Sequence, residues 1–189
     1  MPVTTKAYDH YVTALHSDAF DFLLDLIDAK KITTFLELGT GYGETSDKLH
    51  QRYPDLKITT LEKKPAVYNE ASKRFENTSI KVIHVDAMAY HPDQTFDLIL
   101  VDASKSQQQK LVEKYIPFLT PKGMMLVDNI HISRLKKEPM TRSRRALIKK
   151  HEAFIDYLKN QKALITDFHV IGDGIALIKK NSEIAPKKP

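Results

Sequence analysis

The chain contains the stretch Phe35-Leu36-Glu37-Leu38-Gly39-Thr40-Gly41-Tyr42-Gly43, an apolar run that ends in three glycines, each separated by one residue. This pattern predicts a buried strand followed by a turn, where the lack of Cβ atoms lets a ligand approach the backbone. The spacing is not the G-x-G-x-x-G of a dinucleotide site, and no Lys follows as in a P-loop. Glu37 would repel a phosphate but attract an ammonium or sulfonium. The stretch therefore favours S-adenosylmethionine over a nucleotide phosphate.

A second acidic residue supports a nucleoside ligand. Glu62 ends the next apolar run, roughly 20 residues past the loop, the offset at which a carboxylate can accept hydrogen bonds from ribose hydroxyls. A glycine turn can also serve packing alone, and Tyr42 and Met88 could either border a cofactor or belong to the core. The two carboxylates together favour the cofactor site.

Composition limits the kind of protein. The 189 residues are 42% hydrophobic, enough for one compact core and too few for two ordinary domains. The absence of cysteine excludes disulfides and thiolate metal sites and favours a cytoplasmic protein. No apolar run reaches membrane-spanning length, and residues 1–10 have no apolar signal core. We expect a soluble domain over residues 17–180, with an N-terminal segment 1–16 and a polar tail 181–189.

Strand-like and helix-like runs alternate along the chain. The expected strands are Thr34–Leu38, Ile58–Leu61, Ile80–Val85, Phe96–Val101 and Met124–Val127. Helical periodicity is expected over Ser17–Ala29, Thr45–Tyr53, Ala66–Phe75, Gln107–Phe118 and Arg144–Asn160, with a turn at Thr120-Pro121-Lys122-Gly123. Leu164–Val170 and Ile175–Ile178, joined by Gly172-Asp173-Gly174, predict a terminal antiparallel hairpin. The alternation predicts an α/β fold, a mostly parallel sheet with helices on both faces.

Polar residues follow the expected strands where ligands bind in an open parallel sheet. Asp102 follows one strand and Asp128-Asn129 follows another, a set of oxygen ligands suited to Mg²⁺ or a similar cation. Each of them could instead form a turn or cap a helix. Lys105 comes three residues after Asp102. Beside a metal and a sulfonium the cationic form of its amine is disfavoured, so Lys105 is a candidate general base, although an isolated Lys is usually just solvated.

From about Ile32 to Lys179 the chain resembles the divalent-metal-dependent O-methyltransferases of the catechol and caffeoyl-CoA type, including bacterial relatives that methylate 5-hydroxyuridine in tRNA. The resemblance rests on segments that recur in order: Glu37-Leu-Gly-Thr-Gly-Tyr-Gly, Val85-Asp86-Ala87, Phe96 through Lys105, Asp128-Asn129 and Gly172-Asp173-Gly174-Ile175-Ala176. It implies a single-domain Rossmann-like class I methyltransferase with a seven-stranded sheet.

The resemblance also implies roles for individual residues. Glu62 would hold the ribose, Asp86-Ala87 would border the adenine, Asp102, Asp128 and Asn129 would bind metal, and Lys105 would be the base. The candidate cofactor-binding residues are then Glu37, Gly39, Thr40, Gly41, Tyr42, Gly43, Ser46, Glu62, Asp86, Ala87, Met88 and Asp102. Relatives often form homodimers, and the terminal hairpin or first helix could supply the partner surface.

One strongly basic stretch bears on the acceptor. It contains Glu138 as its only acid, beside Arg134, Lys136, Lys137, Arg142, Arg144, Arg145, Lys149 and Lys150. The stretch could be a solvated helix face, or it could track the phosphates of a tRNA anticodon loop whose target base is turned into the pocket. We expect 5-hydroxyuridine at the tRNA wobble position as the acceptor. The alternatives are a small catechol or caffeoyl-CoA-type substrate and a noncatalytic module that binds RNA or protein.

Overall fold

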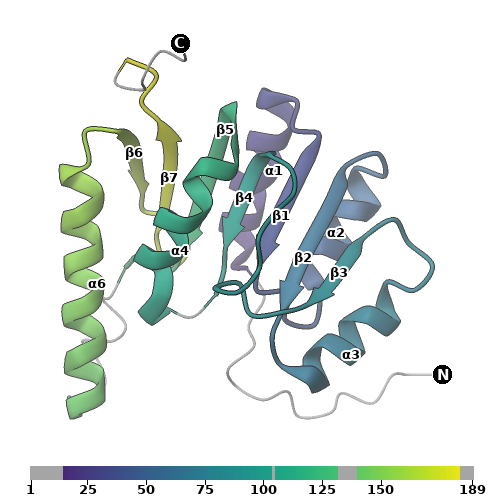
Figure 1. Cartoon of the computed structure of the whole chain (residues 1–189), viewed down its shortest axis with the longest axis horizontal. Coiled ribbons are helices and arrows are strands. Elements are labelled where there is room, and N and C mark those ends of the chain that lie inside the picture. The colour runs from purple at the N-terminus through teal and green to yellow at the C-terminus, as the bar shows by residue number, and fades with distance from the viewer. Residues whose placement is uncertain (1–14, 104, 132–139, 184–189) are drawn as a thin grey trace.

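The computed structural model describes residues 15–103, 105–131 and 140–183, which form a seven-stranded sheet with helices on both faces (Figure 1). The strand order is β3-β2-β1-β4-β5-β7-β6. This arrangement confirms the expected Rossmann-like fold, including a reversal of strand order at β1 beside which ligands bind in such sheets.

Five strands run parallel and the last two complete the sheet in antiparallel pairs. Their bounds are β1 Thr34–Leu38, β2 Lys57–Glu62, β3 Lys81–His84, β4 Phe96–Val101, β5 Leu119–Asp128, β6 Leu164–His169 and β7 Ile175–Lys180. The expected terminal hairpin is confirmed, since β6 pairs with β7 and β7 with β5.

The helices lie close to their expected ranges. They are α1 Ser17–Lys30, α2 Glu44–Arg52, α3 Pro65–Arg74, α4 Gln108–Tyr115 and α6 Arg142–Asn160. The helix expected over Gln107–Phe118 is shorter, because 3₁₀ turns η1 (Lys105–Gln107) and η2 (Ile116–Phe118) flank α4. Pro117 lies in η2, where it cannot donate the backbone hydrogen bond that would extend α4.

Alternation along the buried strands creates two apolar layers. Phe35 and Leu98 pack with α1, α2 and α3 on one face of the sheet. Leu36 and Ile99 pack with α4 and α6 on the other. Because both faces are covered, the central strands are apolar almost throughout, as parallel strands usually are.

The expected turn at Thr120–Gly123 is wrong, because these residues lie inside β5. The ladder with β4 shifts there: Phe96 pairs with Leu119, and Leu98 pairs with Met124. Pro121 is tolerated because a strand irregularity needs fewer ladder hydrogen bonds than a regular strand. Gly123 is required for close approach, since a Cβ there would lie 2.8 Å from the Phe96 carbonyl oxygen.

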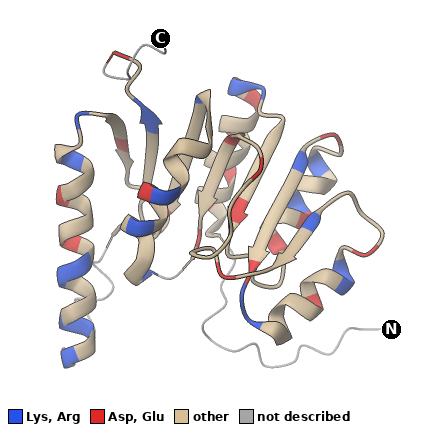
Figure 2. Ribbon diagram, in the orientation of Figure 1, with Lys and Arg blue, Asp and Glu red and all other residues tan. Residues whose placement is uncertain are grey.

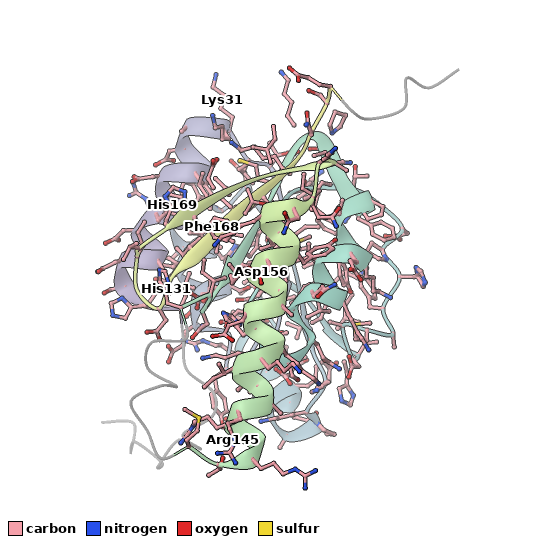
Figure 3. The ribbon with its side chains drawn as sticks, turned by 90° about the vertical axis from the view of Figure 1, so that its left-hand side faces the viewer. Lys31, His131, Arg145, Asp156, Phe168 and His169 are labelled. Atoms are coloured by element: carbon pink, nitrogen blue, oxygen red, sulfur yellow. The ribbon has the colours of Figure 1, made fainter. Side chains whose placement is uncertain are left out.

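β6 forms one edge of the sheet, and its side chains include Ile165 and Phe168, which are 47% and 38% exposed (Figure 3). The homodimer expected from the family resemblance stays a prediction. Within residues 15–103, 105–131 and 140–183, no helix has both the length and the apolar character needed to cross a bilayer. Residues 1–14 and 184–189, which contain most of the two terminal segments, lie outside the described residues.

Candidate functional site

The carboxyl ends of β1, β2, β4 and β5 meet at one edge of the sheet, the lower edge in Figure 1. Acidic residues lie there, as the red segments at the lower ends of the central strands show (Figure 2). Glu37 lies in β1, Glu62 ends β2, Asp102 follows β4 and Asp128 ends β5. The fold therefore brings the acidic candidates from separate parts of the sequence to the same edge.

The glycine loop between β1 and α2 is fixed by its neighbours on both sides. The N–H groups of Gly39 and Thr40 both donate to the Leu61 carbonyl oxygen at 3.0 Å. Gly39 has φ of +107°, and a Cβ at this position would lie 2.5 Å from the Asp102 carbonyl oxygen. Only glycine fits this conformation and this close approach. The loop therefore joins the β2 end and the β4 end of the site.

Glu37 is buried beneath this loop. Its Oε2 accepts hydrogen bonds from the hydroxyls of Ser46 and Thr60, both at 2.7 Å. Burial raises the pKa of Glu37 to about 7, the two hydroxyls oppose the rise, and the charge of Glu62 adds to it. Ser46 is fully buried, so in this structure its hydroxyl serves Glu37. A cation bound above the loop would favour the ionised form of Glu37.

Glu62 is held in a fixed orientation at the end of β2. Its Oε2 accepts from the Gly41 N–H at 3.1 Å, and its Oε1 accepts from the Lys64 N–H at 2.8 Å. Each carboxylate oxygen has a further lone pair. The side chain can therefore shape the glycine loop and still accept hydrogen bonds from a diol.

The Asp86–Met88 segment forms a turn beside β3. Asp86 Oδ1 accepts from the Met88 N–H at 2.8 Å. α4 anchors the same turn, because the Tyr115 hydroxyl donates to the Ala87 carbonyl at 2.7 Å and Lys114 Nζ donates to the Met88 carbonyl at 2.9 Å. These contacts fix the backbone of three candidate cofactor-binding residues, two of which, Asp86 and Ala87, are expected to border the adenine.

Asp102 is half-buried and Asp128 is buried, and their carboxyl groups lie close enough for their charges to interact. Burial raises the pKa of Asp102 well above its usual value, the charges of Asp128 and Glu37 raise it further, and Lys105 opposes them. Burial also raises the pKa of Asp128. Asn129 Nδ2 donates to Asp128 Oδ2 at 2.5 Å. Asp102, Asp128 and Asn129 thus lie in one neighbourhood, as the sequence predicts.

The donor set fits a hard divalent cation. Asp128 Oδ1 is buried and has no hydrogen-bond partner among the described residues, and the repulsion between the two carboxylates would be offset by a cation. In the described part of the chain, no three His, Cys, Asp or Glu side chains are grouped so as to hold a metal. The candidate set is smaller, with two carboxylates and one amide, and it would leave positions open for water and an acceptor.

Lys105 begins η1 and is exposed at the edge of this site. Its charge opposes the rise in pKa that burial causes at Asp102 and Asp128, so its amine lies near both. η1 contacts α6, whose basic N-terminal end lies at the lower edge of the molecule, as Arg145 shows in Figure 3. Arg142 and Arg145 are exposed and Arg144 is half-buried. Arg134, Lys136 and Lys137 lie outside the described residues.

Sequence reasoning missed several polar residues that support the site. Gln108 and His151 are buried and bond the backbone around Asp128, and Thr60 bonds Glu37. Gln108 shares a helix face with Leu111, Val112 and Tyr115, and His151 shares one with Ile148, Phe154 and Leu158. A lone polar residue on an apolar helix face was the available signal.

Comparison with known proteins agrees with this arrangement. The family described as a methyltransferase domain matches residues 35–123. Trans-aconitate 2-methyltransferase from Escherichia coli O1:K1 is 28% identical over 123 residues, covering 64% of this chain and 48% of the relative. The chain thus spans about half the length of the curated relatives it matches.

Solved structures match more of the chain. A candidate caffeoyl-CoA O-methyltransferase from Staphylococcus aureus is 25% identical with a TM-score of 0.82, covering 90% of this chain and 86% of that chain. The O-methyltransferase from Bacillus cereus, solved in complex with SAH, is 17% identical with a TM-score of 0.73, covering 89% and 83%. Residues 35–123 therefore match a methyltransferase domain, and the chain as a whole has the Rossmann-like methyltransferase fold.

Proposed function

We propose that this protein transfers the methyl group of S-adenosylmethionine to a hydroxyl oxygen, assisted by Mg²⁺ or a similar cation. One observation carries the proposal: the glycine loop lies directly against the segment after β4 that bears Asp102. A Cβ on Gly39 would be 2.5 Å from the carbonyl oxygen of Asp102. A cofactor on the loop and an acceptor beside Asp102 would therefore be neighbours, as methyl transfer requires.

The cofactor would lie across Gly39–Gly43, with its ribose at Glu62 and its adenine beside Asp86–Met88. Glu62 suits a ribose because two backbone N–H groups already orient its carboxylate. Glu37 supplies negative charge below the loop and suits a sulfonium better than a phosphate. Structural neighbours solved with SAH or SAM support this choice of cofactor.

The cation would be held by Asp102, Asp128 and Asn129. When bound, it would lower the pKa of a coordinated acceptor hydroxyl and orient the oxygen for attack. Two observations support this assignment: among the described residues Asp128 Oδ1 has no hydrogen-bond partner, and the pKa of the half-buried Asp102 beside Asp128 is raised.

Lys105, as the neutral amine that a bound cation and sulfonium would favour, would take the proton of the acceptor hydroxyl at Nζ. The acceptor oxygen then forms a bond to the methyl carbon as the carbon–sulfur bond breaks, and the electron pair leaves with sulfur as S-adenosylhomocysteine. The charge interaction of Lys105 with both Asp102 and Asp128 supports this role. The other residues bind and orient the reactants.

The acceptor we propose is 5-hydroxyuridine at the wobble position of tRNA, which would become 5-methoxyuridine. Arg142, Arg145 and Lys149 are exposed and recur at helical spacing on α6 (Figure 2). The first turn of α6 has no acidic residue, although basic residues there oppose the helix dipole by about 0.3–1 kcal/mol each. A phosphate backbone along this end of α6 would offset that cost.

A methyl-transfer assay tests the proposal. Purified protein, labelled methyl donor and Mg²⁺ are incubated with total tRNA and, in parallel, with a panel of catechols. Label in 5-methoxyuridine, lost in Lys105→Ala, is the expected result. Turnover of catechols alone would show that the acceptor is a small molecule and not tRNA. A noncatalytic module would label neither and would keep its biological role in Asp102→Ala.

A further inference from the structure

The segment from Asp128 to His131 is held at four backbone atoms by three other parts of the fold. Gln108 Nε2 of α4 donates to the Asp128 carbonyl at 2.7 Å. His151 Nε2 of α6 lies 2.6 Å from the Ile130 carbonyl oxygen. The hairpin between β6 and β7 accepts from the N–H groups of Ile130 and His131 through the carbonyls of Gly174 and Asp173, at 3.0 and 2.8 Å.

The two helix side chains in this clamp are almost completely buried, each with 2% exposure. A carbonyl oxygen can only accept, so His151 must carry its hydrogen on Nε2. Burial lowers the pKa of His151, although the bond to Ile130 opposes that effect. The histidine therefore acts as a neutral, fixed donor, and its acceptor Ile130 directly follows the candidate ligand Asn129.

The clamped turn has a conformation that needs support. Asn129 has φ of +61°, a left-handed conformation that asparagine tolerates better than most residues but that is still unfavourable. The adjacent Asp128 Oδ1 is buried, and residues 15–103, 105–131 and 140–183 offer it no hydrogen-bond partner. Such an arrangement persists only where the surroundings over-determine the backbone.

We propose that His151 and Gln108 are positioning residues that hold the Asp128–Asn129 turn in the shape that binds a divalent cation. The inference rests on the cation site proposed above. It adds the residues that hold the backbone of the candidate ligands in place. It also gives α6 a second role, because the helix with the basic N-terminal end braces the cation turn through His151.

Binding of Mn²⁺ followed by electron paramagnetic resonance tests this without any turnover. His151→Phe and Gln108→Met each remove one donor to the turn while keeping a side chain of similar size. Loss of such supporting bonds typically weakens metal affinity about 10–100-fold, and we expect a loss in this range for both variants. His151→Gln keeps an amide donor and should recover part of the loss. Affinity for S-adenosylmethionine, measured by calorimetry, should stay within about twofold because the glycine loop is untouched.

Leu158→Val is the matched control, since Leu158 is equally buried on α6 but lies about two helical turns further along the helix than His151. Thermal unfolding of all variants shows how much stability each loses. Mn²⁺ affinity that follows stability alone, with the control weakened as much as His151→Phe, would overturn the positioning role. If the wild type and both variants bind Mn²⁺ with the same affinity, the positioning role is wrong and the proposed function still stands. Wild-type protein that binds no Mn²⁺ would overturn both the clamp and the metal assistance.

Discussion

Gly39 and Asp102 touch through their backbones, at a distance that leaves no room for a side chain on the glycine. A methyl group on Gly39 would lie 2.5 Å from the Asp102 carbonyl oxygen and 3.1 Å from its carbonyl carbon. This contact joins the candidate cofactor loop to the candidate cation site, two segments separated by more than 60 positions in the chain. A substitution that disrupts this contact should therefore affect both the cofactor loop and the cation site.

Gly39→Ala should destabilise the protein and abolish tight binding of S-adenosylmethionine. The φ of +107° is unfavourable for alanine by about 1–3 kcal/mol, before the clash is counted. Urea unfolding and calorimetric titration measure the two effects. Gly123→Ala is the control, because a Cβ there also meets backbone atoms at 2.8 Å but lies far from the loop, inside β5. Normal cofactor affinity in Gly39→Ala would contradict the assignment of the loop.

Glu37→Gln should remove part of the pH dependence of stability. Burial raises the pKa of Glu37 to about 7 from an ordinary 4.5, against hydrogen bonds from Ser46 and Thr60. Between these values the folded protein keeps a proton on Glu37 that the unfolded chain releases. The contribution of this proton to the free energy of unfolding is therefore fully present below pH 4.5 and is lost as the pH rises through 7. This loss amounts to on the order of 2–3 kcal/mol.

Thermal unfolding of wild type and Glu37→Gln from pH 4 to 8 checks this expectation. The variant should gain stability relative to wild type as the pH rises, because glutamine cannot ionise and both neighbouring hydroxyls can reorient towards an amide. A constant difference between the two proteins over this range would show that Glu37 titrates normally.

Asp97→Asn should destabilise the sheet near the start of β4, at the end opposite the candidate site, and should leave the site unchanged. Asp97 Oδ2 accepts from the N–H and hydroxyl of Thr33, at 3.0 and 2.8 Å, and Oδ1 accepts from the Thr120 hydroxyl at 3.1 Å. Burial acts to raise the pKa of Asp97, but these bonds and one from Thr34 outweigh it and lower the pKa. The stabilisation is therefore present above pH 3.8 and lost as the pH falls through the lower folded value.

Unfolding by urea at pH 7 should show a loss of about 2 kcal/mol in Asp97→Asn, since hydrogen bonds to a charged group contribute roughly this much. The loss should shrink below pH 3. An equal loss at both pH values would mean that the charge of Asp97 does not contribute to the free energy of unfolding.

Local patterns predicted most of the fold, and distant contacts explain the rest. Phe96–Val101 is predicted to the residue because its apolar run is bounded by polar positions on both sides. The turn at Thr120–Gly123 is wrong because local turn propensity gave way to pairing of β5 with β4. For the site, the positions of Asp102 and Asp128 after expected strands predicted that the two residues lie close together. The supporting roles of Gln108 and His151 depend on helix packing, which one sequence does not reveal.

Charge reversal on α6 should separate RNA binding from the fold. Arg142→Glu combined with Lys149→Glu should weaken tRNA binding, and each lost phosphate contact should reduce the salt slope by about 0.7 for a single strand. Lys159→Glu is the control, because Lys159 is exposed in the last turn of the same helix. Fluorescence anisotropy at several salt concentrations measures both quantities. A double variant that binds tRNA as well as the control does would remove α6 from the proposed RNA surface.

Titration calorimetry with S-adenosylmethionine, and with NAD⁺ and ATP for comparison, tests the central claim most directly. The glycine loop with Glu37 below it and Glu62 beside it predicts saturable binding of one S-adenosylmethionine per chain, weaker by about tenfold or more in Glu62→Gln, and no comparable binding of the two phosphate-bearing nucleotides. Tight binding of NAD⁺ or ATP with no heat from S-adenosylmethionine would contradict the account.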